Sequence, residues 1–188
     1  MLSADPFLYN IAIRFKELQK GQRETLLHPS ASKGPSRIEI HQFQIMPVRQ
    51  ASCFQPADFE GILKNKKMKI EPGDALLIYT GYSKLWMSDN ARYLDLQPGP
   101  GKRAAQWIAD KKVGITGADT ASFDVVTPGT KELFPCHQVL ITDHGIQLVE
   151  NMKLDELALS GIDEFLFVMA PLKLKGGAGS PVAPFAVL

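Results

Sequence analysis

The sequence is poor in cysteine, since only Cys53 and Cys136 occur among its 188 residues. Two cysteines do not make the disulfide framework of a small secreted domain, so we expect free, buried thiols in a reducing compartment. No apolar run approaches the roughly 20 residues that span a bilayer. The first ten residues lack the basic segment that opens a signal peptide. These absences predict a cytoplasmic protein without a membrane partner.

An excess of charge of one sign is also lacking. Lys and Arg number 21 against 20 Asp and Glu, which gives a formal net charge of +1. This balance gives no reason to expect binding to nucleic acid or to an anionic membrane surface. Hydrophobic residues make up 45% of the chain and charged residues 22%, an ordinary globular composition. The chain is therefore expected to bury one sizeable core.

The first 37 residues differ from the rest. An apolar face with spacings of three and four predicts an amphipathic helix over residues 5–20. Residues 21–37 are rich in glycine, proline and serine, which is typical of a linker. We therefore divide the chain into an N-terminal helix and linker, residues 1–37, and a main domain, residues 38–188.

The main domain mixes predicted strands with predicted helices, which indicates an α/β or α+β fold. A short helix opens at Gln55-Pro56, and a second one contains residues 104–112. Asp143-His144-Gly145 is interpreted as a hairpin turn, and the apolar end of the chain is expected to pack back on the core. Strands are predicted over residues 37–46, 75–80, 113–118, 139–142, 146–149 and 165–170.

One polar segment, residues 119–124, follows directly on a predicted buried strand. It holds Asp119, Thr120, Ser122 and Asp124. Polar groups at the end of a core strand often form a site in α/β folds. The alternative is a turn in which small polar side chains bond their own backbone.

A second segment holds His137, Asp143, His144 and Glu150 near apolar strands. An imidazole and a carboxylate there are candidates for metal ligands or for an acid/base pair. The alternative is a set of ordinary surface or core residues. The glycine-rich residues 175–180 lack the order of a phosphate-binding loop, so nucleotide binding is not expected.

Read together, four stretches resemble the cyclase-like metal-dependent hydrolases, the family of kynurenine formamidase and isatin hydrolase. The resemblance covers about residues 38–188, and the stretches follow the order of the family. They are EPGDALLIYTGYSKLW (71–86), VGITGADTASFD (113–124), the segment 137–150 with the following NMKLDEL, and APLKLKGGAGSPV (170–182).

The resemblance implies a compact α/β domain with mixed, barrel-like sheets and flanking helices, assembled as a homodimer or homotetramer. It also implies a divalent metal, zinc or manganese, that activates water. The bond attacked would be an amide, lactam or lactone of a small cyclic or N-acyl substrate.

The resemblance also assigns site residues. His137 and Glu150 match positions of the family's metal and catalytic region. The substrate-binding residues that it implies are Asp119, Thr120 and Ser122, with Tyr82 and Trp86 as pocket walls.

The family's main metal motif, HxGTHxDxP, does not occur in this sequence. His137 and Glu150 give two ligands, whereas a catalytic divalent site normally has three protein ligands and water. His28, His41 or a second subunit are candidates for the missing ligand.

Three hypotheses follow. The first is an amide-bond hydrolase, either with a metal or with Glu150 as general base. The second is a catalytically impaired relative that binds a small molecule or a partner subunit in the retained pocket. The third is an altered gene product in which the first 37 residues replace the family's metal segment.

Overall fold

The structure is a computed structural model that describes residues 51–129 and 133–188. A 3₁₀ turn spans Tyr82–Leu85, and a π-helical segment spans Gln138–Asp143. The helices are α1 (Pro56–Lys66), α2 (Asn90–Leu94), α3 (Lys102–Asp110), α4 (Pro135–His137) and α5 (Asp155–Leu159). The strands are β1 (Cys53–Phe54), β2 (Ala75–Ile78), β3 (Gly99–Pro100), β4 (Ile115–Ala118), β5 (Gln147–Val149), β6 (Leu166–Val168) and β7 (Phe185–Val187).

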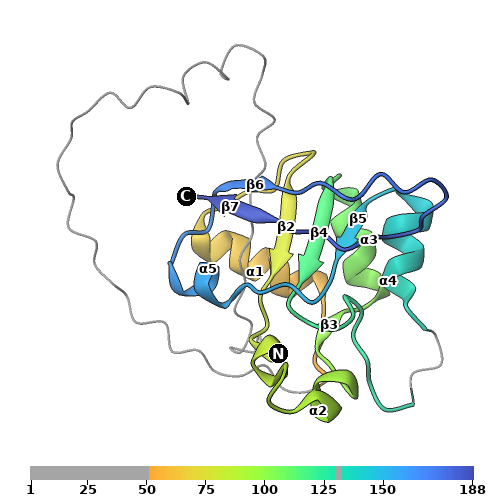
Figure 1. Cartoon of the computed structure of the whole chain (residues 1–188). Coiled ribbons are helices and arrows are strands. Elements are labelled where there is room, and N and C mark those ends of the chain that lie inside the picture. The colour runs from red at the N-terminus through yellow and green to blue at the C-terminus, as the bar shows by residue number, and fades with distance from the viewer. Residues whose placement is uncertain (1–50, 130–132) are drawn as a thin grey trace.

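The centre of the fold is a three-stranded parallel sheet in the order β2-β4-β5. Ala75 of β2 pairs with Ile115 of β4, which in turn pairs with Gln147 of β5. Figure 1 shows the arrowheads of β2 and β4 at the same edge. Because parallel strands all end at one edge, the loops that follow β2, β4 and β5 gather there.

Both faces of this sheet are buried. Leu76 and Ile78 of β2 pack in one core with residues of α1 and α3, whereas Leu77 and Tyr79 pack in a second core on the opposite face. Phe167 of β6 belongs to the second core. Alternate side chains of one strand thus enter two cores, which explains the continuous apolar run that predicted this strand.

The smaller sheets extend this arrangement. Strand β1 pairs with β3 in parallel, and β6 pairs with β7 in antiparallel fashion. Strand β7 lies at the end of the chain, and its Ala186 packs against the second core. The prediction that the apolar end of the chain packs back is therefore confirmed.

The two longest helices of the described residues form where the sequence predicts them. Helix α1 begins with Pro56, and the Asp58 carboxylate accepts a hydrogen bond of 2.7 Å from the N–H of Gln55. Lysine side chains in its last turn face the negative end of the helix dipole. Helix α3 buries Ala104, Ala105, Ile108 and Ala109 against the sheet.

The strand predicted over residues 139–142 is wrong, because these residues lie in the π-helical segment that continues α4. Val139 and Leu140 are buried against α3, whereas Ile141 is 46% exposed, and this burial pattern is helical. A short apolar run does not distinguish a buried strand from a buried helix. The predicted hairpin turn at 143–145 is wrong for the same reason, since it follows a helical segment.

The barrel-like arrangement is not supported, because none of the three sheets in the described ranges closes on itself. The α/β class itself is confirmed by helices that flank a parallel sheet. Both cysteines are free, as predicted, but only Cys136 is buried and Cys53 is exposed.

Several predictions fall outside the described residues. These are the helix over 5–20, the linker over 21–37, the strand over 37–46, and His28 with His41. Within residues 51–129 and 133–188, every helix is too short or too polar to cross a membrane.

Two glycines provide a matched test of the packing. A Cβ at Gly117 of β4 would lie 2.7 Å from the Val149 carbonyl oxygen and 2.7 Å from Met152 Sδ. Gly117→Ala should therefore lower the free energy of unfolding by about 1–3 kcal/mol. Gly61 lies within α1 with nothing within 4 Å of its added Cβ, so Gly61→Ala should raise that free energy by about 0.5–1 kcal/mol. Urea titration measures both, and equal effects would contradict the packing described.

Candidate active site

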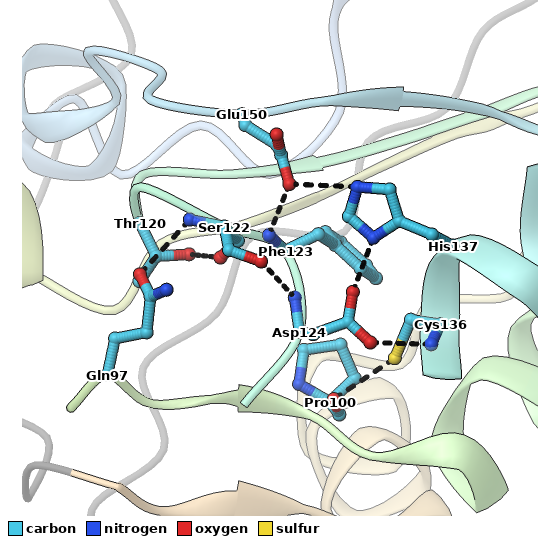
Figure 2. Close-up of polar contacts among 9 residues, drawn as sticks. All are labelled: Gln97, Pro100, Thr120, Ser122, Phe123, Asp124, Cys136, His137 and Glu150. Atoms are coloured by element: carbon cyan, nitrogen blue, oxygen red, sulfur yellow. Dashed lines mark hydrogen bonds and ion pairs between the residues drawn. The ribbon is translucent and has the colours of Figure 1, made fainter. Parts of the chain in front are cut away.

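The candidate site lies at the edge where the parallel strands end. The segment 119–124 follows β4, and Glu150 follows β5 directly. Helix α4 brings His137 beside them (Figure 2). This edge of a parallel sheet is where α/β proteins generally bind ligands.

The centre of the site is the His137 ring, which lies between two carboxylates. Its Nδ1 atom is 2.6 Å from Asp124 Oδ2, and its Nε2 atom is 3.4 Å from Glu150 Oε1. The side chains of His137 and Glu150 are 32% and 33% exposed, whereas that of Asp124 is 1% exposed. Asp124 is therefore a buried anchor, and the other two groups are accessible to a ligand.

The buried Asp124 carboxylate is fully engaged. Its Oδ1 atom accepts a hydrogen bond of 2.5 Å from the N–H of Cys136, in the first turn of α4. The first N–H groups of a helix have no partner within the helix, so they are free to bind an anion. The carboxylate thus fixes both the start of α4 and the orientation of the His137 ring.

Glu150 is held by the same segment. The N–H of Phe123 donates a hydrogen bond of 2.7 Å to Glu150 Oε1. Phe123 precedes Asp124, so of two adjacent residues one holds the Glu150 carboxylate and the other holds the His137 ring. The distance between Glu150 and His137 consequently depends on the conformation of residues 119–124.

That conformation is fixed by further contacts. Thr120 Oγ1 donates to the carbonyl oxygen of Ser122 at 2.6 Å, and the N–H of Ser122 donates to Gln97 Oε1 at 3.1 Å. A Cβ at Gly99 would lie only 2.6 Å from the carbonyl oxygen of Phe123. The close approach of β3 to this segment therefore requires glycine at position 99.

The surroundings raise the pKa of His137 above its ordinary value of 6.5. The main cause is the hydrogen bond to Asp124. Partial burial opposes it, and the negative charges of Asp124 and Glu150 add to it.

The substrate-binding roles of Asp119, Thr120 and Ser122 stay predictions, and the structure shows which contacts these residues make. The Asp119 carboxylate is bonded to residues of the loop after β2. Its Oδ1 atom accepts hydrogen bonds of 2.8 and 2.7 Å from the N–H and hydroxyl of Thr80, and its Oδ2 atom accepts one from the Ser83 hydroxyl. Burial raises the pKa of Asp119, and the hydrogen bonds from Thr80 and Ser83 oppose this shift. The Asp119 carboxylate thus ties the end of β4 to the loop after β2. Thr120 and Ser122 lie in the segment that holds Asp124.

The two predicted aromatic walls differ in exposure. Tyr82 is 5% exposed, and its hydroxyl lies at the carbonyl oxygens of Arg92 and Leu96. Trp86 is 46% exposed and packs edge-on against Tyr93, with ring centroids 5.4 Å apart. The role of both as pocket walls stays a prediction, and the exposed Trp86 fits it better.

The other polar residues of the second segment make local contacts. Asp143 accepts a hydrogen bond of 2.8 Å from Gln138 Nε2, and His144 Nδ1 lies 2.7 Å from the carbonyl oxygen of Val139. These contacts stay within the π-helical segment and its end, which agrees with the alternative that Asp143 and His144 are ordinary surface or core residues.

Two residues were not assigned to the site from the sequence. Asp124 lies in the polar segment 119–124, but its contact with His137 could not be predicted, because the two residues are 13 positions apart and meet only through the fold. Phe134 is 48% exposed, and its ring centroid lies 5.3 Å from that of His137. It also has a left-handed φ of 54°, which is unusual for a bulky residue. The only signal in the sequence is its position three residues before His137.

The raised pKa of His137 gives a direct test of the ring's contacts. In the metal-free chain, NMR titration of the ring should give a pKa above 6.5, and Asp124→Asn should bring it back toward that value. Because folding raises this pKa, the protonated His137 ring stabilises the folded chain. This contribution to the free energy of unfolding is complete below about pH 6.5 and is lost as the pH rises through the folded pKa. A pKa that Asn at position 124 leaves unchanged would contradict the contact.

The chain is similar to known proteins in sequence and in fold. A family model described as putative cyclase matches residues 37–125. The isatin hydrolase of Roseibium aggregatum is 28% identical over 127 residues, which cover 64% of this chain and 47% of that protein. The crystal structure of a novel cyclase superposes with a TM-score of 0.68 and 30% identity, over 76% of this chain and 48% of that chain.

A potential metal-dependent hydrolase with cyclase activity shares the fold alone, with a TM-score of 0.53 at 20% identity over 72% of this chain and 58% of that one. The chain spans about half the length of the isatin hydrolase and of the cyclase that it matches. The resemblance to the cyclase-like metal-dependent hydrolases is therefore confirmed.

Proposed function

We propose that the chain is a hydrolase that cleaves an amide, lactam or lactone bond in a small cyclic or N-acyl substrate. The observation that carries this proposal is the accessible His137 ring between Asp124 and Glu150. The likeness to an isatin hydrolase supports the choice of a cyclic amide as substrate.

The described residues offer two neighbouring ligands for a metal ion, His137 and Glu150. Across residues 51–129 and 133–188, no group of three or more His, Cys, Asp or Glu could hold one. His137 Nε2 and Glu150 Oε1 are nevertheless 3.4 Å apart, a separation that suits two ligands each about 2 Å from one ion. Asp124 on the other ring nitrogen is the outer partner typical of a metal-binding histidine.

The described residues thus fit as part of a metal site, and a further ligand would come from another part of the chain or from another subunit. A bound zinc or manganese ion supplies Lewis-acid activation of water and of the substrate carbonyl.

The protein groups have separable roles. Asp124 holds the proton of His137 on Nδ1, so that Nε2 faces Glu150 and the accessible side of the site. Glu150, held by the N–H of Phe123, is placed to accept a proton from an attacking water as general base. With an ion bound, Nε2 would hold the ion, and the protonated Glu150 carboxyl would return its proton to the leaving nitrogen or oxygen. In a site without the ion, a protonated His137 ring is placed to donate its Nε2 proton to the leaving atom and to recover one from Glu150.

An aromatic surface borders these groups. The half-exposed Phe134 ring lies beside His137, and this position suits it to pack against a planar substrate. Together with the neighbouring carboxylates, it favours a neutral aromatic or cyclic amide over an anionic substrate.

Single substitutions test the assigned roles. His137→Ala and Glu150→Gln should each lower kcat/KM by about 100-fold or more, because each removes a proton-transfer group. Hydrolysis of isatin and of N-formyl aromatic amines, followed by absorbance, measures this. His144→Ala is the matched histidine control and should keep full activity, since among the described residues its ring bonds the local carbonyl of Val139.

If the wild-type chain hydrolyses none of these substrates but isatin raises its Tm, the second hypothesis, a ligand-binding relative without catalysis, would replace the proposal. An active His137→Ala variant would contradict the assigned site.

Metal removal tests the role of the ion. Dialysis against a chelator should abolish hydrolysis, and added zinc or manganese should restore it in the wild-type chain but not in Glu150→Gln. Elemental analysis should find about one ion per chain in the active wild-type protein. A chain that contains no metal and keeps its activity would contradict the metal part of the proposal.

A further inference from the structure

Tyr93 of α2 is fully buried, and its hydroxyl joins the two segments that carry the candidate site. We propose that Tyr93 is a positioning residue that fixes the Glu150 carboxylate relative to His137. Its consequence for catalysis rests on the proposed function, whereas its consequence for geometry does not.

The hydroxyl of Tyr93 lies at the ends of two neighbouring strands. It is 2.7 Å from Asn151 Oδ1 and 3.1 Å from the carbonyl oxygen of Asp119. Both atoms are acceptors, so the single phenolic proton is shared between them. Asp119 begins the segment that ends in Asp124, and Asn151 follows Glu150, so this one hydroxyl links the two halves of the site.

The chain turns at Asn151, next to Glu150. Asn151 has a φ of 54°, in the left-handed region that asparagine adopts more readily than most other residues besides glycine. Its N–H donates to the carbonyl oxygen of Thr120 at 2.8 Å, and its side chain accepts from Tyr93. The direction of the chain at Asn151 sets the direction in which the preceding residue, Glu150, projects.

Loss of the Tyr93 hydroxyl should therefore change the position of the Glu150 carboxylate. Without this hydroxyl, Asn151 Oδ1 and the Asp119 carbonyl oxygen lose a buried donor, and the left-handed turn is held by one contact fewer. The hydrogen bond of 2.7 Å from the Phe123 N–H to Glu150 Oε1 should then weaken. Small displacements of a catalytic group cost rate more than substrate binding.

The experiment compares Tyr93→Phe with Tyr79→Phe, which both keep the aromatic ring. The measurement is the NMR chemical shift of the Phe123 amide, which donates a hydrogen bond to Glu150. Glu150→Gln gives the reference shift for a lost carboxylate acceptor. Tyr93→Phe should move the Phe123 amide toward this reference and lower kcat about tenfold to a hundredfold with little change in KM. Tyr79→Phe is the matched control: Tyr79 is also buried, but its hydroxyl has no hydrogen-bond partner in the described part of the chain.

Tyr79→Phe should leave both the Phe123 amide and kcat unchanged. Asn151→Gly, which removes the acceptor while it permits the left-handed φ, should move the Phe123 amide in the same direction as Tyr93→Phe. If Tyr93→Phe does not fold, Asn151→Gly still tests the link between Tyr93 and Glu150.

The proposal is overturned if Tyr93→Phe or Asn151→Gly leaves the Phe123 amide in place, or if Tyr79→Phe moves it equally. If the wild-type chain has no hydrolytic activity, the proposed function fails, but the amide shifts still decide the positioning role.

Discussion

The contact on which the site depends is the hydrogen bond of 2.6 Å between the buried Asp124 carboxylate and the His137 ring. A buried carboxylate is unfavourable unless its oxygens are hydrogen-bonded. One oxygen of Asp124 receives the Cys136 N–H and the other faces the His137 ring, so the two interactions also fix where α4 begins. The buried Asp124 carboxylate needs hydrogen-bond donors, and this requirement fixes the position of His137.

Asp124 can do this because the parallel sheet holds its segment in place. Strands β2, β4 and β5 end at one edge, where Asp119, Glu150 and the Tyr93 hydroxyl tie their loops together. The same sheet has a core on each face, and Gly117 leaves no room for a side chain between β4 and β5. The closely packed sheet thus ends directly at the accessible Glu150, beside His137.

Much of this fold could be predicted from local sequence patterns. The apolar run of β2 follows the Pro72-Gly73 turn, and α1 has a proline at its start and lysines at its end, so each pattern points to one structure. The run Val139-Leu140-Ile141 does not, because a short apolar segment fits a strand or a helix, and packing on α3 decides between them. The barrel was an expectation from the family resemblance, and the described residues contain only open sheets.

The site was only partly predictable. His137 and Glu150 came from the resemblance, and the structure brings them to 3.4 Å. Asp124 was one of four polar residues in a short segment, and nothing local distinguishes it from Asp119, whose carboxylate has a different set of partners. Tyr93 could not be found at all, since the sequence does not show which strand ends a buried hydroxyl will reach.

The central claim is that Asp124 orients His137 for the hydrolysis of an amide bond. The most direct measurement is the steady-state hydrolysis of isatin by the wild-type chain and by Asp124→Asn, with Tm recorded for both. Our account predicts an active wild type and a variant that folds but loses about 100-fold or more in kcat. A folded Asp124→Asn variant with the wild-type kcat would contradict it.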